Sequence, residues 1–313
     1  MSRPVLVTGA SGFAGGHFLD LLSQTDTGVV AWHQPGGQPL QTPRTEWAAV
    51  DVLDRAAVRA AVQRARPIEV YHFAGAAHVG NAWSDSTSTF EVNVLGTYHL
   101  MDALRDAAPD ASVLLPSSAL VYESSGRHLR EDDPIRPKSP YGLSKLAQEL
   151  VARSCGGPKG PKVFIARAFN HLGPRQSPLF VASAFAKQVA EIESGKAPPE
   201  LRVGNLEARR DLTDVRDTVR AYRAIVQRGT PDRPYNVCSG EAVSIRELLD
   251  RLLSRSRVPV HVIVDPLRYR PSDVPLVVGD RSRLQNEVGW QPELPLERTL
   301  DDLLAFWRSQ VSA

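Results

Sequence analysis

A glycine-rich turn near the start of the chain constrains the fold more than any other feature of the sequence. Residues 9–15 read GASGFAG and lie between the apolar run at 5–7 and a helical pattern. Glycine permits a tight turn and lets the backbone approach a pyrophosphate, which then lies against the unpaired N–H groups that begin the helix. The strand before and the helix after favour a dinucleotide site on Gly9, Gly12 and Gly15 over an ordinary glycine-rich turn.

The first half of the chain alternates short apolar runs with amphipathic helical stretches. Strands are predicted at residues 5–7, 29–31, 69–73, 113–115 and 163–165, and helices at 15–23, 55–65, 90–107 and 141–153. This alternation predicts an α/β fold with a Rossmann-type, doubly wound parallel sheet that carries helices on both faces. In such a sheet ligands bind at the carboxyl ends of the strands, where the strand order reverses.

Prolines weaken the alternation in the second half, at 174, 178, 198 and 199. We expect a helix at 180–194, and a helix at 214–227 with a strand at 235–237 that rejoin the sheet. Segments 244–254, 260–264 and 296–308 predict a smaller mixed α/β lobe that binds the substrate. The predicted domains are therefore discontinuous: residues 1–169 plus about 211–239 bind the cofactor, and about 170–210 plus 240–313 form the lobe.

Composition excludes several classes of function. The chain has 313 residues and a net charge of +2, with acidic and basic residues interspersed, so neither a nucleic-acid nor a membrane surface is expected. Arg202, Arg209 and Arg210 form a local basic group that could meet a phosphate. Cys155 and Cys238 form neither a disulfide framework nor a metal spacing, and zinc motifs are absent from the sequence. With no signal-like or membrane-spanning run, we expect a cytoplasmic protein without a metal.

The stretch YGLSK places Tyr141 and Lys145 at i and i+4, on one face of a predicted helix. A free phenol has a pKa of about 10, and a neighbouring ammonium favours the phenolate, which brings the pKa closer to that of an acid–base catalyst. Ser118 ends a predicted strand that reaches the same crevice, where its hydroxyl could orient a carbonyl. Tyrosine and lysine at this spacing are common on helix surfaces, but the preceding elements bring this pair to the cofactor. An oxidoreductase is therefore predicted.

The segment after the second strand bears on the choice of cofactor. It reads VAWH, up to Trp32 and His33, and lacks the carboxylate that binds the ribose 2′-hydroxyl in NAD enzymes. Without that acid a 2′-phosphate meets no repulsion, so NADPH is favoured slightly over NADH, although no arginine follows immediately. Asp51 and Val52 could hold the adenine, or Asp51 could be an acid at a helix N-terminus, and both interpretations stay open.

In this order, GASGFAG, HFAGAAHV, FEVNVLGTYHL, PSSALVY and YGLSK resemble the extended short-chain dehydrogenase/reductase family along nearly the whole chain. The resemblance implies a Rossmann domain, a smaller nucleotide-sugar lobe and a catalytic triad of Ser118, Tyr141 and Lys145. It also implies that Asn93 supports the lysine through water, and that the helices at 90–107 and 141–153 form a homodimer interface. The implied cofactor-binding residues are Gly9, Ser11, Gly12, Phe13, Ala14, Gly15, Trp32, Asp51, Val52, Phe73, Ala74, Gly75, Asn93, Ser117, Tyr141, Lys145 and Ala168.

Three segments of the second half, RAFNHLGPRQSPLFVASAFAKQVAEIE, VGNLEARRDLTDVRD and RYRPSDVPLVVGDRSRL, are similar to GDP-mannose-type members of that family. By this resemblance cationic and polar side chains bind the pyrophosphate or guanosine and Asp273 binds the nucleotide's ribose, although any single arginine could equally be a solvated surface charge. The implied substrate-binding residues are His78, Ser118, Asn170, Lys187, Val203, Arg210, Arg270 and Asp273. Asn81 and Trp83 are expected near the sugar, while packing explains Trp83 equally well.

Position 120 separates the activities that this family implies. Dehydratases that the chain resembles carry a glutamate two residues before the tyrosine of the PSSALVY segment, where this chain has Leu120, which cannot exchange a proton. Strand alternation would give Glu123 a different direction. We therefore expect NAD(P)H-dependent reduction of the C4 ketone of GDP-4-keto-6-deoxy-D-mannose to GDP-D-rhamnose. A nucleotide-sugar 4-epimerase with bound NAD is the alternative, followed by a 4,6-dehydratase. A non-catalytic cofactor sensor is disfavoured because Tyr141 and Lys145 are both present.

Overall fold

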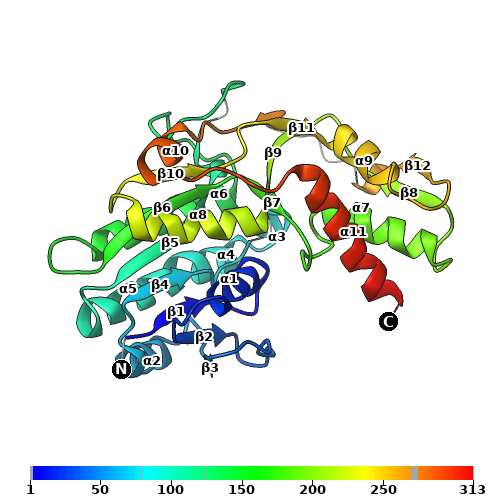
Figure 1. The fold of residues 1–313 in the computed structure, drawn as a ribbon. Coiled ribbons are helices and arrows are strands. Elements are labelled where there is room, and N and C mark those ends of the chain that lie inside the picture. The colour runs from blue at the N-terminus through cyan, green and yellow to red at the C-terminus, as the bar shows by residue number, and fades with distance from the viewer. Residues whose placement is uncertain (1–2, 78, 124, 269–273, 313) are drawn as a thin grey trace.

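A seven-stranded parallel sheet forms the larger part of the computed structural model, which describes residues 3–77, 79–123, 125–268 and 274–312 (Figure 1). The strand order is β10-β6-β5-β4-β1-β2-β3, and every pairing is parallel. The strands are β1 Val5–Thr8, β2 Val29–His33, β3 Thr45–Ala49, β4 Glu69–His72, β5 Ser112–Ser118, β6 Lys162–Ala168 and β10 Pro234–Val237. The predicted fold class is confirmed.

Helices bury both faces of this sheet. One apolar core includes Phe18 of α1, Val219 of α8 and Leu284 of α10, and a second includes Val58 of α2, Leu100 of α5 and Ala152 of α6. The helices are α1 Phe13–Ser23, α8 Val215–Arg228 and α10 Ser282–Val288 on one side, and α2 Arg55–Ala65, α5 Gly96–Ala107 and α6 Pro140–Cys155 on the other. Strands buried on both faces explain the nearly continuous apolar runs of the sequence.

The strand order reverses at β1. From β1 the chain passes outward to β2 and β3, and then crosses back to β4, on the other side of β1. Because the strands are parallel, the turns that follow Thr8, His72 and Ser118 all leave the same edge of the sheet. This edge is the usual ligand-binding position of an open α/β sheet.

The second half adds a smaller lobe, seen beside the large sheet in Figure 1. Its apolar core joins α7, α9, α11 and β8, and includes Phe185, Leu201, Leu249 and Leu303. Its elements are β7 Asn170–Leu172, α7 Val181–Glu193, β8 Glu200–Val203, β9 Arg209–Asp214, β11 Ala242–Ser244, α9 Ile245–Leu253, β12 His261–Val264, a 3₁₀ turn at Pro266–Arg268, β13 Leu276–Val277 and α11 Leu296–Ser312. The strand β9 pairs with β7, β11 and β13, and β8 pairs with β12. The discontinuous domain boundaries stay a prediction.

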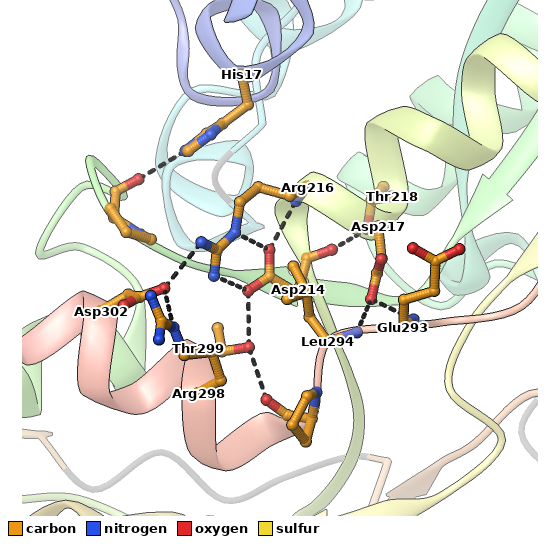
Figure 2. Close-up of polar contacts among 12 residues, drawn as sticks. His17, Asp214, Arg216, Asp217, Thr218, Glu293, Leu294, Arg298, Thr299 and Asp302 are labelled. Atoms are coloured by element: carbon orange, nitrogen blue, oxygen red, sulfur yellow. Dashed lines mark hydrogen bonds and ion pairs between the residues drawn. The ribbon is translucent and has the colours of Figure 1, made fainter. Parts of the chain in front are cut away.

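A cluster of paired charges joins the lobe to the large sheet at the start of α8 (Figure 2). The Asp214 carboxylate, which is fully buried, accepts hydrogen bonds from the Arg216 guanidinium and from the Thr299 hydroxyl of α11. Arg216 also bonds Asp302 of α11. Beside it, the Asp217 carboxylate accepts hydrogen bonds from the backbone N–H groups of residues 293 and 294. We call these residues (214, 216, 217, 299 and 302) the junction cluster.

The helix expected at 90–107 is interrupted. The segment contains the end of α4 (Ser86–Phe90), a π-helical turn at Glu91–Leu95, and then α5. A further short helix, α3 at Val79–Ser84, precedes α4. Single π-turns inside helices occur most often at functional sites, and this one carries Asn93. No helix in the part of the chain that is described has the length and apolar character needed to cross a bilayer.

Candidate functional site

The glycine turn after β1 has the shape of a phosphate cradle. Gly9 has a φ of 61°, and a Cβ there would lie 2.5 Å from the Ala74 nitrogen. A Cβ on Gly15 would lie 2.3 Å from the Gly9 carbonyl oxygen. Gly12 is the N-cap residue of α1, and no side chain makes a capping hydrogen bond there. Only glycine fits at positions 9 and 15, and the arrangement fits a dinucleotide pyrophosphate.

The residues expected around the rest of the dinucleotide lie at the same edge of the sheet. His33 ends β2, and its imidazole Nδ1 lies 2.9 Å from the Gln34 carbonyl oxygen. The Trp32 side chain is buried in the core, which leaves only its backbone at the edge. Asp51 accepts a hydrogen bond from the Leu53 N–H, while Asp54 is the residue that caps α2. Asp54 is therefore the N-cap residue of α2, and Asp51 lies in the turn before this helix.

Ser118 and Tyr141 meet where β5 and α6 approach each other. The helix begins at Pro140, with the Ser139 hydroxyl capping the Gly142 N–H. A Cβ on Gly142 would lie 2.4 Å from the Leu120 carbonyl oxygen, so glycine lets the start of α6 pack against the end of β5. The Ser118 and Tyr141 hydroxyls share a hydrogen bond as a result.

The pKa of Tyr141 moves opposite to our expectation. Burial of the phenol raises its pKa to about 12, although the hydrogen bond with Ser118 acts in the other direction. The prediction that Lys145 would lower this pKa is wrong: desolvation of the phenolate is the largest cause of the shift, and the opposing contribution comes from Ser118. Tyr141 therefore holds its proton at neutral pH, as a proton donor must.

Lys145 lies one turn further along α6 and is buried, whereas Tyr141 is half-buried. Its Nζ donates a hydrogen bond of 2.6 Å to the Gln148 carbonyl oxygen. Burial lowers the pKa of Lys145 to about 8, against the opposing charge of Glu149. Among the described residues no carboxylate lies within 4.0 Å of this ammonium. The lysine is thus a buried cation held by a neutral amide.

Asn93 approaches the site from the π-turn. Its side-chain oxygen accepts a hydrogen bond from the Ala76 N–H, and its Nδ2 donates to the Ala76 carbonyl and to the Ser144 hydroxyl. Asn93 therefore ties the loop after β4 to α6, one residue before Lys145. Its expected support of the lysine through water stays a prediction.

A buried ion pair lies behind the site, and sequence reasoning missed it. Arg167 of β6 donates hydrogen bonds of 3.0 and 2.9 Å to Glu149 of α6, which also accepts one from the Ser117 hydroxyl. Arg167 further donates to the Tyr122 hydroxyl and the Glu131 carbonyl. The pair fixes α6 against the ends of β5 and β6, next to Ser118. The signal in the sequence was a glutamate one turn beyond Lys145, on the same helix face.

Strand alternation was expected to turn the Glu123 side chain away from the site. The structure gives a different reason. The strand stops at Ser118, and Ala119–Val121 form a 3₁₀ turn, so strand alternation does not continue to Glu123. The Glu123 carboxylate instead pairs with Arg136 at 3.1 Å. Leu120, in the place where resembling dehydratases carry a glutamate, is half-buried beside Ser118.

The residues expected at the substrate come from several parts of the lobe. The Lys187 ammonium lies 3.4 Å from the Glu191 carboxylate and above the Trp307 ring. Arg210, on β9, donates to the Arg209 carbonyl, and burial lowers its pKa. The Val203 side chain is buried in the core of the lobe, Asn170 is exposed at the start of β7, and the Trp83 side chain is exposed on α3. His78, Arg270 and Asp273 lie outside the described residues, and the side chain of Asn81 is not described.

A parallel doubly wound sheet, a glycine cradle and a Ser–Tyr–Lys set at its carboxyl edge together define an extended short-chain dehydrogenase/reductase. Residues 6–303 match the family of GDP-mannose 4,6 dehydratase, so the chain belongs to that family. It is 32% identical to the GDP-6-deoxy-D-mannose reductase of Pseudomonas aeruginosa, over 99% of each chain. These matches confirm the resemblance that the motifs indicate.

Solved structures give the same result for the fold. The P. aeruginosa protein RMD complexed with NADPH superposes with a TM-score of 0.88 at 31% identity, covering 99% of this chain and 100% of the other. A putative epimerase from Burkholderia cenocepacia superposes with a TM-score of 0.86 at 33% identity, covering 98% and 99%. The fold therefore covers the whole chain and includes both the sheet and the lobe.

Proposed function

We propose that this protein reduces the C4 ketone of GDP-4-keto-6-deoxy-D-mannose to GDP-D-rhamnose with NAD(P)H. The observation that carries this proposal is the placement of the Tyr141 phenol beside Ser118, at a turn where position 120 holds a leucine. A ketone reduction needs one proton donor and nothing that removes a carbon-bound proton. The similarity to GDP-6-deoxy-D-mannose reductase along the full length supports the same substrate.

The nicotinamide supplies the hydride when it is bound. Tyr141 donates the proton to the ketone oxygen as the alcohol forms, and the Ser118 hydroxyl holds that oxygen by a hydrogen bond. The Lys145 ammonium binds the cofactor's ribose and stabilises the phenolate that Tyr141 becomes. A general acid of this kind contributes typically 10²- to 10⁴-fold to a rate.

The cofactor is a nicotinamide dinucleotide, with NADPH preferred. No carboxylate ends β2, where His33 stands instead, so nothing repels a 2′-phosphate. The relative RMD is complexed with NADPH. The glycine cradle (Gly9, Gly12, Gly15), the first turn of α1 and the ends of β2, β4, β5 and β6 provide the proposed contacts.

We assign the GDP portion of the substrate to the smaller lobe. Cationic side chains suit a diphosphate, and Arg210 lies on β9 of this lobe. The contacts that the sequence resemblance proposes are His78, Asn170, Lys187, Arg210, Arg270 and Asp273, with Val203 through its backbone because its side chain is buried.

The test is an assay of the purified protein with freshly generated GDP-4-keto-6-deoxy-D-mannose, in which NADPH and NADH loss are followed separately and the sugar product is identified. Stoichiometric oxidation to GDP-D-rhamnose is expected, with NADPH the better substrate. If nothing is oxidised, the proposal fails.

A nucleotide-sugar 4-epimerase is the second candidate, and the similarity to a putative epimerase at 33% identity favours it. Such an enzyme would keep NAD bound through purification and interconvert GDP- or UDP-hexoses without net oxidation. The nucleotide content of the purified protein, measured after denaturation, separates the two candidates.

We further propose a cytoplasmic homodimer built on α5 and α6. Leu95, Tyr98, Leu143 and Leu150, on these helices and the π-turn before them, are exposed by 44, 39, 49 and 60%. Apolar side chains grouped on packed helices suit a second copy of the same surface. Sedimentation should show a dimer that Leu150→Glu weakens, whereas Leu267→Glu, at a leucine that is 94% exposed, should leave it unchanged. A wild-type monomer would refute this part.

A further inference from the structure

A chain of buried hydrogen bonds leads from Lys145 away from the substrate, through groups that the proposed mechanism does not use. Lys145 donates to Gln148 Oε1, and Gln148 Nε2 donates 2.8 Å to the Thr97 hydroxyl of α5. The same hydroxyl lies 3.0 Å from His72 Nε2, at the end of β4. His72 Nδ1 lies 2.7 Å from the Thr8 hydroxyl, which accepts a hydrogen bond from the Ala74 N–H.

The protons of this chain have one consistent arrangement. The Thr97 hydroxyl donates 2.6 Å to the Asn93 carbonyl, so its oxygen accepts from Gln148 and from His72. His72 therefore carries its proton on Nε2 and accepts from Thr8 at Nδ1. Burial lowers the pKa of His72 to about 3, which keeps the ring neutral. Because the Thr97 proton is already donated to Asn93, the Thr97 oxygen can only accept from Gln148, so Gln148 turns its NH₂ to Thr97 and its carbonyl oxygen to Lys145.

Burial makes this arrangement rigid. Gln148, Thr97 and Thr8 are completely buried and His72 is 2% exposed, so a broken bond has no water to replace it. The charged or titratable groups that face Lys145 are Tyr141 and Glu149 on its own helix and His72 on β4; Arg167 of β6 neutralises Glu149. None of them accepts a hydrogen bond from Nζ within the described residues. The Gln148 carbonyl is the acceptor that orients the ammonium.

The far end of the chain is anchored at the glycine cradle. Thr8 is the last residue of β1 and precedes Gly9, and Ala74 is the residue against which Gly9 packs. One connected set of hydrogen bonds therefore relates the position of Lys145 to the turn that receives the pyrophosphate. The Gln148 amide connects Lys145 to the rest of this set of hydrogen bonds.

We propose that Gln148 is a positioning residue for Lys145, and that Thr97 and His72 act through Gln148 by fixing the direction of its amide. The inference rests on the proposed function for its kinetic readout. Gln148 touches neither substrate nor cofactor in this account. It holds the ammonium in place for the ribose and for Tyr141, and it favours the charged form of the lysine.

Gln148→Met keeps the shape and removes both hydrogen bonds, so kcat should fall about 10- to 100-fold, while KM for the ketosugar changes by less than about threefold. Losing an acceptor disfavours the ammonium, so the alkaline limb of the kcat profile should move to lower pH. Gln148→Glu places a carboxylate at the ammonium and should move the limb to higher pH. The matched control is Gln188→Met, which removes an amide that makes two hydrogen bonds with residue 202. This variant should change neither kcat nor the position of the alkaline limb.

Thr97 supplies a second pair of variants should Gln148→Met not fold. Thr97→Val should reproduce the loss of kcat and the shift of the limb, and Thr97→Ser, which restores the hydroxyl, should recover most of both. Equal behaviour of the valine and serine variants would overturn the role of Thr97. A Gln148→Met enzyme with the wild-type limb and kcat would overturn the proposal.

A readout without substrate separates this inference from the proposed function. The pH dependence of Lys145 acetylation by acetic anhydride, followed by peptide mass spectrometry, reports the pKa of the lysine directly. The pKa of Lys145 should fall in Gln148→Met and rise in Gln148→Glu, whether or not the wild-type enzyme reduces the ketosugar. An unchanged pKa in both variants would refute the inference, whereas a wild-type protein that reduces no ketosugar would refute only the function.

Discussion

Two polar clusters in this molecule hold a cation in opposite ways, one with a half-buried arginine and one with a buried lysine. In the junction cluster, Arg216 contacts the Asp214 carboxylate through two nitrogens and Asp302 through a third (Figure 2). In the candidate site, Lys145 contacts the neutral Gln148 amide. The hydrogen bond with Asp214 raises the pKa of Arg216, and burial lowers the pKa of Lys145 to about 8.

The difference separates a cation that holds the fold together from one that takes part in chemistry. A half-buried cation with carboxylate partners, such as Arg216, keeps its charge at every pH that the protein survives, because its pKa is raised. A buried cation with only neutral partners loses its proton near the working pH. Variants of the two clusters should therefore differ in what they change: activity at one and stability at the other.

Replacing Tyr141 with Phe removes the proton donor and leaves the ring. We expect kcat to fall about 10²- to 10⁴-fold, with the dissociation constant for NADPH changed by less than about threefold. Steady-state kinetics and a fluorescence titration with NADPH measure the two quantities. Full activity in this variant would show that the proton comes from elsewhere.

Replacing Asp214 with Ala breaks the junction cluster and removes the cap of α8. The free energy of unfolding should fall by about 1–3 kcal/mol, because α8 loses its cap and the buried Thr299 hydroxyl loses an acceptor, while Arg216 keeps its contact with Asp302. Chemical denaturation followed by circular dichroism gives the value. The alkaline limb of kcat should stay where it is in the fraction that remains folded. If the alkaline limb of the kcat profile shifts in the Asp214→Ala variant, the two clusters are coupled.

In the wild-type enzyme kcat should decline as pH rises through about 8, because the ammonium of Lys145 loses its proton there. The sign follows from the charge: the form that binds the ribose is present below this pKa and is lost above it. Each unit beyond the pKa removes about ninety per cent of the remaining ammonium. Activity that is constant to pH 10 would contradict the lowered pKa.

The smallest effect on stability is expected at a surface ion pair. The pair of Arg246 with Glu207 is exposed, by 57 and 77% of the two side chains. Replacing Glu207 with Ala should change the free energy of unfolding by less than about 1 kcal/mol and leave the kinetics alone. A loss comparable to that of the Asp214 variant would show that burial is not what distinguishes the clusters.

The sequence was sufficient for six of the seven strands of the large sheet and for α7, α9, β12 and α11 of the lobe, but not for β3 or for the short strands around β9. The strands buried on both faces appear in the sequence as apolar runs, and the helix expected at 141–153 is α6, Pro140–Cys155. The strand β9 (RRDLTD) has no such pattern, because its polar Asp211 is buried against the N–H groups of residues 239, 240 and 279. Those partners lie far along the chain, where a local pattern cannot reveal them.

The candidate site shows the same limit. Spacing along one helix was enough to bring Tyr141 and Lys145 together in the prediction. The spacing could not show how far the two side chains are removed from water. Desolvation raises the pKa of Tyr141, whereas the spacing alone predicts a lower pKa. Gln148 lies three residues after Lys145 and could have been found by the same spacing, but Thr97 and His72 come from other elements.

The most direct test of the proposed reduction is transfer of a label from the cofactor. NADPH carrying deuterium at C4 of the nicotinamide, prepared separately on each face, is incubated with the protein and GDP-4-keto-6-deoxy-D-mannose, and the product is examined by NMR. The account predicts one deuterium at C4 of the sugar from one face only, with one NADP⁺ released for each GDP-D-rhamnose formed. GDP-D-rhamnose that forms without deuterium at C4 from either labelled face would contradict it.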